Sequence, residues 1–319
     1  MSSMKRTISS KVVVEKNDEI SLLDLPELTL ECILERLSPA GLYAMSGVCS
    51  SMRNRCGSDH LWEKHVNKKW GKLIGNAAAY REWQWQPTLV DRTKQRGLFG
   101  SVSSVWPLSW ITPTEQRHSS LPVDSVMDLY IALESGKLWF PAQVYNRENG
   151  YVGFMLSSYD AEVSYDSCTD TFRARYSPHW QQTTEENIVW NRLRARTVDT
   201  LPHVLHVSDC LNDLSPGDHI EIQWRRKKEF PYGWWYGVVA HLESCNGNKI
   251  DCRCHSSEKV ILEFKQYSAG SQWGKTVINR KEHREIGNEA DGFYGGIRKL
   301  YHEEEISMWR RLWPPQLLE

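Results

Sequence analysis

The chain has 319 residues, of which 40% are apolar and 25% are charged, as is typical of a globular protein. Its 39 Lys and Arg residues nearly balance 40 Asp and Glu residues, so the net charge of −1 provides no global field to attract nucleic acid or an anionic membrane. With 15 Trp, 13 Tyr and 7 Phe, the composition excludes disorder over most of the length. No stretch approaches the roughly 18 uninterrupted apolar residues of a membrane-spanning helix.

The N-terminal residues 1–20 are polar and unpatterned, so we expect them to form a disordered tail. Their apolar run, Val12–Val14, is too short for the core of a signal peptide. The 8 Cys residues are spread along the chain, and several lie within apolar patterns, as reduced buried thiols do. We therefore expect an intracellular protein of the cytoplasm, the nucleus or both.

Residues 21–70 carry the apolar periodicity of several short helices. The first is predicted to begin at Asp24 and Pro26, a capping residue followed by a proline in the first turn. Its apolar face repeats at i, i+3, i+4 and i+7, at Leu30, Ile33, Leu34 and Leu37. Ser38-Pro39 predicts a second helix, and further apolar stripes follow at Val48, Cys49, Met52 and Cys56 and then at Leu61, Trp62, His65 and Val66. Such short helices are marginal alone, so they must pack on one another or on a partner.

The spaced residues of this region resemble the F-box, a helical domain of about fifty residues, in the size range of the smallest domains. The resemblance extends from Leu22 to about Trp70 and rests on Leu25-Pro26, Ile33-Leu34, Leu37-Ser38-Pro39, Leu42, Val48-Cys49 and Leu61-Trp62. Many F-boxes have Trp where this chain has Met52, a flexible apolar residue that can fill the same gap. The whole chain is also similar to a group of plant F-box proteins with a Trp-rich C-terminal half.

The resemblance implies a binding partner. An F-box binds the Skp-type adaptor of a cullin–RING ubiquitin ligase, the SCF complex, and the rest of the chain presents a target protein. The residues that the resemblance assigns to the adaptor interface are Leu25, Pro26, Leu28, Ile33, Leu34, Leu37, Pro39, Leu42, Val48, Cys49, Leu61 and Trp62. A helical bundle in which the same stripes are only core is the alternative, and several positions can serve both purposes.

Residues 71–120 are expected to be a linker or helical extension, and residues 121–319 a β-rich domain with two or three helices. Helices are predicted at 124–135, 184–194 and 303–313. Strands are predicted at 137–145, 151–157, 161–165, 171–176, 219–225, 234–242, 260–267 and 273–278, with a hairpin signal at Asn149-Gly150. The predicted fold class is therefore α+β, a small helical domain followed by a mostly antiparallel β-rich domain.

The strand around Trp234, Trp235 and Tyr236 is similar to the aromatic strand of a small Tudor or Agenet barrel. If the similarity holds, these rings can line a pocket for a cationic or methylated side chain and so bind the target. The alternative is that they pack in the core and pair across strands, as most buried aromatic residues do.

A metal site is conceivable at Cys245, Cys252 and Cys254, with His241 as a fourth ligand. Zinc sites usually consist of two separated ligand pairs, and here the close pair is C-x-C with no second clean pair. The spacing therefore favours free thiols, and we expect no metal and no cofactor.

The sequence contains no nucleophile elbow, phosphate-binding loop or dinucleotide fingerprint, so we expect a non-catalytic protein. The favoured function is the substrate-recognition subunit of an SCF-type ubiquitin ligase, which reaches cullin and RING subunits through its adaptor. The alternatives are a Tudor- or Agenet-like chromatin- or peptide-binding protein without a role in ubiquitination, and an enzyme whose catalytic groups converge from distant positions.

Overall fold

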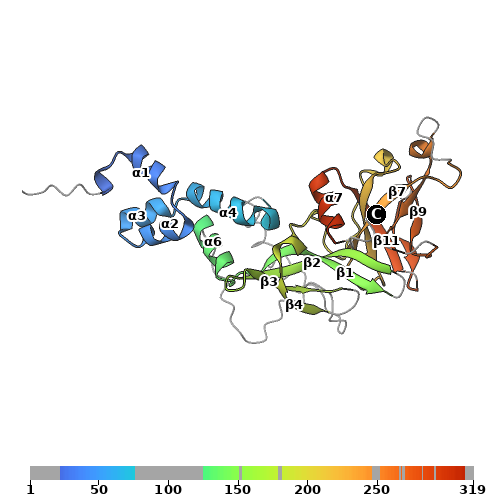
Figure 1. The fold of residues 1–319 in the computed structure, drawn as a ribbon, viewed down its shortest axis with the longest axis horizontal. Helices are drawn as coiled ribbons and strands as arrows, with labels where there is room; N and C mark the ends of the chain where they lie inside the picture. The colour runs from blue at the N-terminus through green and yellow to red at the C-terminus, as the bar shows by residue number, and fades with distance from the viewer. Residues whose placement is uncertain are drawn as a thin grey trace, which may run out of the picture. The chain divides into compact units, whose positions relative to one another are not determined.

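The structure, a computed structural model, describes residues 22–75, 125–150, 153–178, 182–245, 252–265, 267, 270–281, 283–290 and 292–312 (Figure 1). The chain divides into two compact units, Met1–Leu61 and Trp62–Glu319. The expected tail at 1–20 and most of the expected linker at 71–120 lie outside the described residues. Among the helices that are described, none is long and apolar enough to cross a bilayer.

The first unit consists of short helices. They are η1 (Leu22–Asp24), α1 (Glu27–Leu34), α2 (Pro39–Ser46), α3 (Ser50–Cys56) and the first turn of α4 (Asp59–Ile74). Ser38 caps α2 as expected, because its Oγ accepts the Gly41 N–H at 3.2 Å. The expected cap at Asp24 is wrong: Asp24 ends η1, and Pro26 precedes α1 without a side-chain cap bond.

The described part of the second unit contains one antiparallel sheet of 11 strands, the rest of α4 and two further α-helices, which confirms the α+β class. The two further helices are α6 (Val126–Glu134) and α7 (Glu303–Arg310). The strands are β1 (Phe140–Gly150), β2 (Gly153–Asp166), β3 (Thr171–Tyr176), β4 (Thr183–Ile188), β5 (Leu193–Arg194), β6 (His219–Arg225), β7 (Gly233–Ala240), β8 (Lys259–Glu263), β9 (Lys275–Asn279), β10 (Ile286–Asn288) and β11 (Gly292–Lys299).

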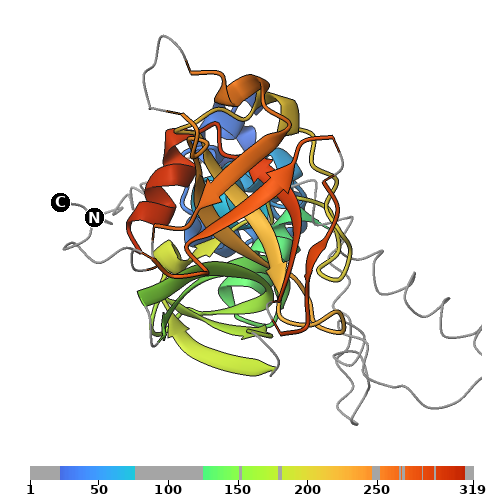
Figure 2. The same cartoon turned by 90° about the vertical axis from the view of Figure 1, so that its right-hand side faces the viewer.

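The strand order is β10-β11-β6-β7-β2-β1-β5, with β3 and β4 added beside β2, and β8 and β9 added beside β7. The two halves of the sheet meet at a short ladder, where Ser157 and Ser158 of β2 pair with Trp235 and Trp234 of β7. In Figure 2 the later strands (orange and red) lie above the green strands β1 to β3. The sheet thus has two lobes that share few backbone hydrogen bonds.

Two sequence predictions in this unit are wrong. The two strands expected at 151–157 and 161–165 form the single strand β2, because β1 pairs with it from Gly150↔Gly153 to Phe140↔Val163. The helix expected at 184–194 is instead β4, a 3₁₀ turn at Trp190–Arg192, and β5. Pairing with β3 extends this segment, and Arg192 then donates from Nε to the Tyr145 carbonyl at 3.1 Å.

The strand β11 is absent from the predicted strands, and three of its eight residues are glycine. Two of these glycines, Gly292 and Gly296, lie where neighbouring segments pack closely against the strand. A Cβ at Gly296 would lie 2.1 Å from the His206 carbonyl oxygen, and a Cβ at Gly292 would lie 2.7 Å from the Trp224 ring. Glycine at these places therefore allows neighbouring segments to approach β11.

A buried ion pair joins the lobes of the sheet. Glu221 of β6 is fully buried and binds both Arg194 of β5, which is 6% exposed, and Arg298 of β11, whose Nη2 lies 3.1 Å from Oε2. Arg194 also donates to Gln143 Oε1 at 2.7 Å and to Ser158 Oγ at 3.0 Å. Each buried charge therefore has an opposite charge and further polar partners, which burial requires.

We predict that Glu221→Gln destabilises the second unit by about 3–5 kcal/mol, because the buried Arg194 loses its counter-charge and the half-buried Arg298 keeps only Glu305. Thermal or denaturant unfolding of the purified chain measures the change. The control is Glu258→Gln, which removes an exposed pair with Lys281 and should leave the stability almost unchanged. Equal stability of the two variants would contradict the importance of the buried pair.

The same pair predicts a pH dependence. Burial alone raises the pKa of Glu221, but the charges of Arg194 and Arg298 outweigh it and lower the pKa to about 2. Because this folded value lies below the unfolded one, the stabilisation is present at neutral pH and is lost as the pH falls from about 4.5 towards 2. The melting temperature should therefore fall more steeply over this window in the wild type than in Glu221→Gln. Parallel curves would contradict the assignment.

Candidate functional site

The first unit leaves six large apolar side chains exposed between residues 22 and 48. They are Leu22 (39% exposed), Leu23 (47%), Leu28 (76%), Ile33 (37%), Tyr43 (59%) and Val48 (69%). We call this set the exposed apolar residues of the first unit. So many large apolar side chains left in water within so short a segment are typical of an interaction surface.

The residues predicted for the adaptor interface fall into three groups by burial. Those that are exposed are Pro26, Leu28, Ile33 and Val48. Those that are half-buried are Leu25, Leu37, Pro39 and Cys49. Those that are buried are Leu34, Leu42, Leu61 and Trp62. The exposed group can contact a partner directly, whereas the buried group supports the fold.

Sequence reasoning missed three exposed apolar residues. Leu22 and Leu23 lie in η1, before the helical periodicity begins, and Tyr43 follows Leu42 directly and so lies off the buried stripe of α2. The signal that could have found Tyr43 is its place directly after Leu42, because successive residues of a helix point in directions about 100° apart.

Exposed polar contacts link α1 to α3 and α4. Arg55 of α3 pairs with Glu27 at the start of α1, and His60 of α4 lies 3.3 Å from Glu31. The hydrogen bond from Arg55, together with its charge, lowers the pKa of Glu27. Such exposed pairs contribute little energy, but they orient α1, which carries Leu28 and Ile33.

Comparison with known proteins identifies this region. The family model for the F-box domain matches residues 22–64. F-box protein At2g26850 of Arabidopsis thaliana is 57% identical over 314 residues, covering 94% of this chain and 84% of the relative. F-box protein At2g41170 of the same plant is 53% identical over 332 aligned positions, covering 99% of this chain and 89% of the relative. The chain belongs to the F-box protein family.

Membership of the F-box family indicates which class of protein binds the first unit. An F-box domain implies binding to a Skp-type adaptor in SCF complexes, so the domain and its relatives support an adaptor-binding role for this chain.

The aromatic triplet of β7 lies in the core of the second unit. Trp234 and Trp235 are each 2% exposed, and Tyr236 is fully buried. Trp235 stacks on Trp224 with ring centroids 4.3 Å apart, and Tyr236 stacks on Trp309 at 5.6 Å. The burial agrees with the packing alternative. Target binding by these rings would require the core to open.

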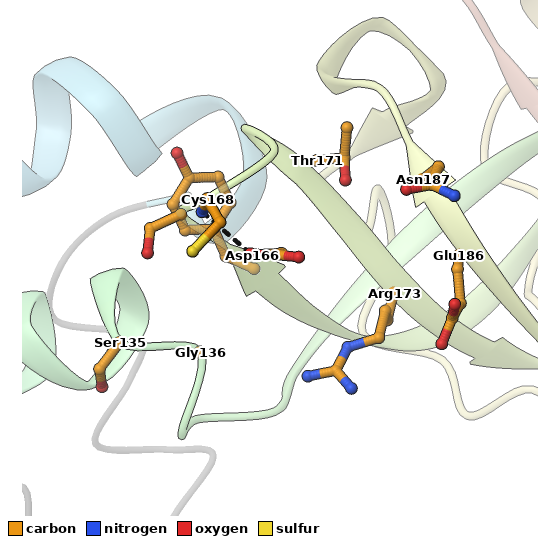
Figure 3. A pocket seen from close by; sticks show the side chains of 10 residues that line it. Ser135, Gly136, Asp166, Cys168, Thr171, Arg173, Glu186 and Asn187 are labelled. Carbon is orange, nitrogen blue, oxygen red and sulfur yellow. Dashed lines mark hydrogen bonds between the residues drawn. The ribbon is translucent and has the colours of Figure 1, made fainter.

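A polar pocket of about 370 Å³ lies where the β2–β3 turn approaches the end of β4 (Figure 3). It is lined by Ser135, Gly136, Tyr165, Asp166, Ser167, Cys168, Thr171, Arg173, Glu186 and Asn187. The Cys168 N–H donates to Asp166 Oδ1 at 2.9 Å, which shapes the turn. The lining combines a thiol with the carboxylates of Asp166 and Glu186 and the guanidinium of Arg173.

We predict that Leu28→Asp and Val48→Asp each weaken binding of the purified Skp-type adaptor by about 2 kcal/mol, roughly thirtyfold in dissociation constant. Both side chains are exposed, so the F-box should remain folded. The matched control is Val277→Asp on β9, which is 50% exposed and lies in the other unit. Isothermal titration and circular dichroism measure binding and folding. Folded variants that bind with wild-type affinity would contradict the interface.

Proposed function

We propose that this protein is the substrate-recognition subunit of an SCF-type ubiquitin ligase. Its F-box binds the Skp-type adaptor, and through the adaptor it joins the cullin and RING subunits. The β-rich unit binds a target protein and presents it for ubiquitination in the cytoplasm or nucleus, where the 8 free cysteines stay reduced. The observation that supports this most is the set of exposed apolar residues in the F-box.

A receptor of this kind needs two binding surfaces and no catalytic centre. The second unit has its own aromatic core, in which Trp70, Trp235 and Trp309 are almost fully buried. It can therefore hold a rigid surface for a target, because its packing is already complete without one.

The segment 201–207 is a candidate for the target surface. It carries four exposed apolar side chains, Leu201 (51% exposed), Val204 (50%), Leu205 (36%) and Val207 (82%). Its backbone is nevertheless fixed: the buried Gln223 accepts the His206 N–H at 2.8 Å and donates to the Val204 carbonyl at 3.1 Å. A fixed backbone with outward apolar side chains loses little entropy on binding, which favours a recognition surface.

The proposal predicts that the two binding activities can be separated. In affinity purification with a proteasome inhibitor, the wild type should capture adaptor, cullin and target. The variant Leu25→Ala with Pro26→Ala should lose the adaptor but retain the target. The variant Val204→Asp with Val207→Asp should retain the adaptor but lose the target, and Val277→Asp should retain both.

Mass spectrometry of the captured proteins identifies the target, which should accumulate when the proteasome is inhibited. If the folded variant with Leu25→Ala and Pro26→Ala still captured the adaptor at the wild-type level, the proposed F-box interface would be excluded. A chain that captures no adaptor but binds methyl-lysine peptides on an array would support the Tudor- or Agenet-like alternative instead.

A further inference from the structure

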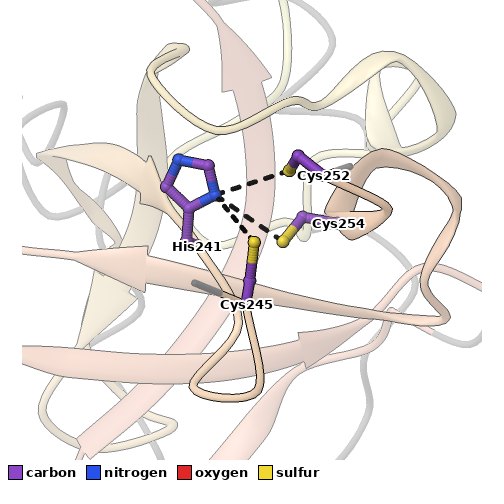
Figure 4. Close-up of side chains that lie close together, drawn as sticks. All are labelled: His241, Cys245, Cys252 and Cys254. Carbon is purple, nitrogen blue, oxygen red and sulfur yellow. Dashed lines mark hydrogen bonds between the residues drawn. The ribbon is translucent and has the colours of Figure 1, made fainter. Parts of the chain in front are cut away.

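The connection between β7 and β8 brings together one histidine and three cysteines. His241 follows the last residue of β7, and Cys245 lies four residues further on. Cys252 and Cys254 precede β8, with Cys254 at the start of a 3₁₀ turn. Figure 4 shows the three sulfur atoms directed at the same edge of the imidazole ring. The four ligand atoms all lie within 4.8 Å of one another.

The distances in this cluster match those of a tetrahedral metal site. The Sγ atoms of Cys245 and Cys252 each lie 3.5 Å from His241 Nδ1, and Cys254 Sγ lies 3.8 Å away. In a tetrahedron with Zn–S bonds of about 2.3 Å and a Zn–N bond of about 2.0–2.1 Å, a nitrogen and a sulfur are about 3.6 Å apart. In the same ideal tetrahedron two sulfurs are about 3.8 Å apart. Since no two ligand atoms of the cluster are more than 4.8 Å apart, the widest pair would need to approach by about 1 Å at most.

Hydrogen bonds alone do not account for this arrangement. A neutral imidazole nitrogen has one lone pair in the ring plane and accepts one good hydrogen bond. Three thiols surround the single Nδ1 of His241, so at most one can donate to it well. A cation at the centre instead engages the nitrogen lone pair and all three sulfurs at once.

We propose that His241, Cys245, Cys252 and Cys254 bind a Zn²⁺ ion. The three thiols release their protons on binding, so the ion and its ligands carry a net charge of −1. Three thiolates and one imidazole fill all four tetrahedral positions, which is typical of a structural site and not of a catalytic one. The ion fastens the end of β7 to the start of β8 and so stabilises the β7–β8 connection.

Groups around the ligands support the site. The Leu242 N–H donates to Cys254 Sγ at 3.3 Å, as backbone amides do to metal-bound thiolates. Arg280 holds the turn that carries Cys254: its Nε donates to the Ser257 carbonyl at 2.8 Å and its Nη2 to the Leu214 carbonyl at 2.7 Å. Cys254 itself is 5% exposed, whereas His241 is exposed, which gives an ion access from solvent.

The proposal departs from the expectation of free thiols, which rested on spacing. The C-x-C pair has no second pair nearby in the sequence, and all four residues fall within one connection between strands. In the structure the ligand atoms of these four residues lie close together. The reason is that β7 and β8 are antiparallel neighbours, with Ala240 opposite Ile261, so the two ends of the connection lie side by side. The spacing of the cysteines along the sequence does not reveal this proximity.

The test is the metal content of the full chain, copurified with its adaptor and without a metal-affinity tag. Elemental analysis should find about one zinc ion per chain. Cys252→Ser should lose most of the zinc, and Cys168→Ser, which changes an exposed thiol outside the cluster, should retain it. Zinc that stays at wild-type content in Cys252→Ser would overturn the assignment.

A measurement on the wild type covers the case in which Cys252→Ser fails to fold. Iodoacetamide labelling followed by mass spectrometry should modify the exposed Cys32 and Cys168 readily and leave Cys245 and Cys252 protected. A chelator should release the zinc and expose these two thiols to the reagent. Purified protein without zinc, with Cys245 and Cys252 modified as fast as Cys168 or joined in a disulfide, would overturn the proposal.

Discussion

The second unit depends on one buried carboxylate. Glu221, at the centre of the sheet, is fully buried, and it binds Arg194, Arg298 and the indole N–H of Trp309. A buried carboxylate is costly unless it is paired, so β5, β6, β11 and α7 must meet at this point. Within the described sheet the two lobes are joined by a short β2–β7 ladder, so this network also fixes how the lobes align.

The two units differ in how completely they bury their apolar side chains. The second buries aromatic rings in clusters around Trp70, Trp235 and Trp309 and needs no partner to complete them. The F-box has short helices with few buried residues each, and Leu28 and Val48 remain more than half exposed. A helical domain this small is marginal alone. Adaptor binding would therefore stabilise it by mass action as well as assemble the complex.

The sequence predicted those elements in which local periodicity decides the structure. The strands 171–176 and 219–225 were predicted with their observed bounds, because alternation of apolar and polar residues needs no further information. The segment 184–194 was predicted as a helix and is not one, because pairing with β3 overrides its helical spacing. In the F-box, the resemblance assigned Ile33 and Leu34 of one stripe to the interface, and burial separates them, since a stripe does not reveal which of its residues the fold covers.

Burial and pairing set the protonation states of several titratable groups in the second unit. An acid–base catalyst needs a group whose pKa lies near the working pH. Here pairing lowers the pKa of Glu221 to about 2, and burial raises the pKa of Tyr145 to about 12. Burial also lowers the pKa of His206 and His283, which remain neutral near pH 7 while they contact Thr200 and the Gly295 carbonyl. These four groups therefore stabilise the packed core, and none of them has a pKa that suits acid–base catalysis near neutral pH.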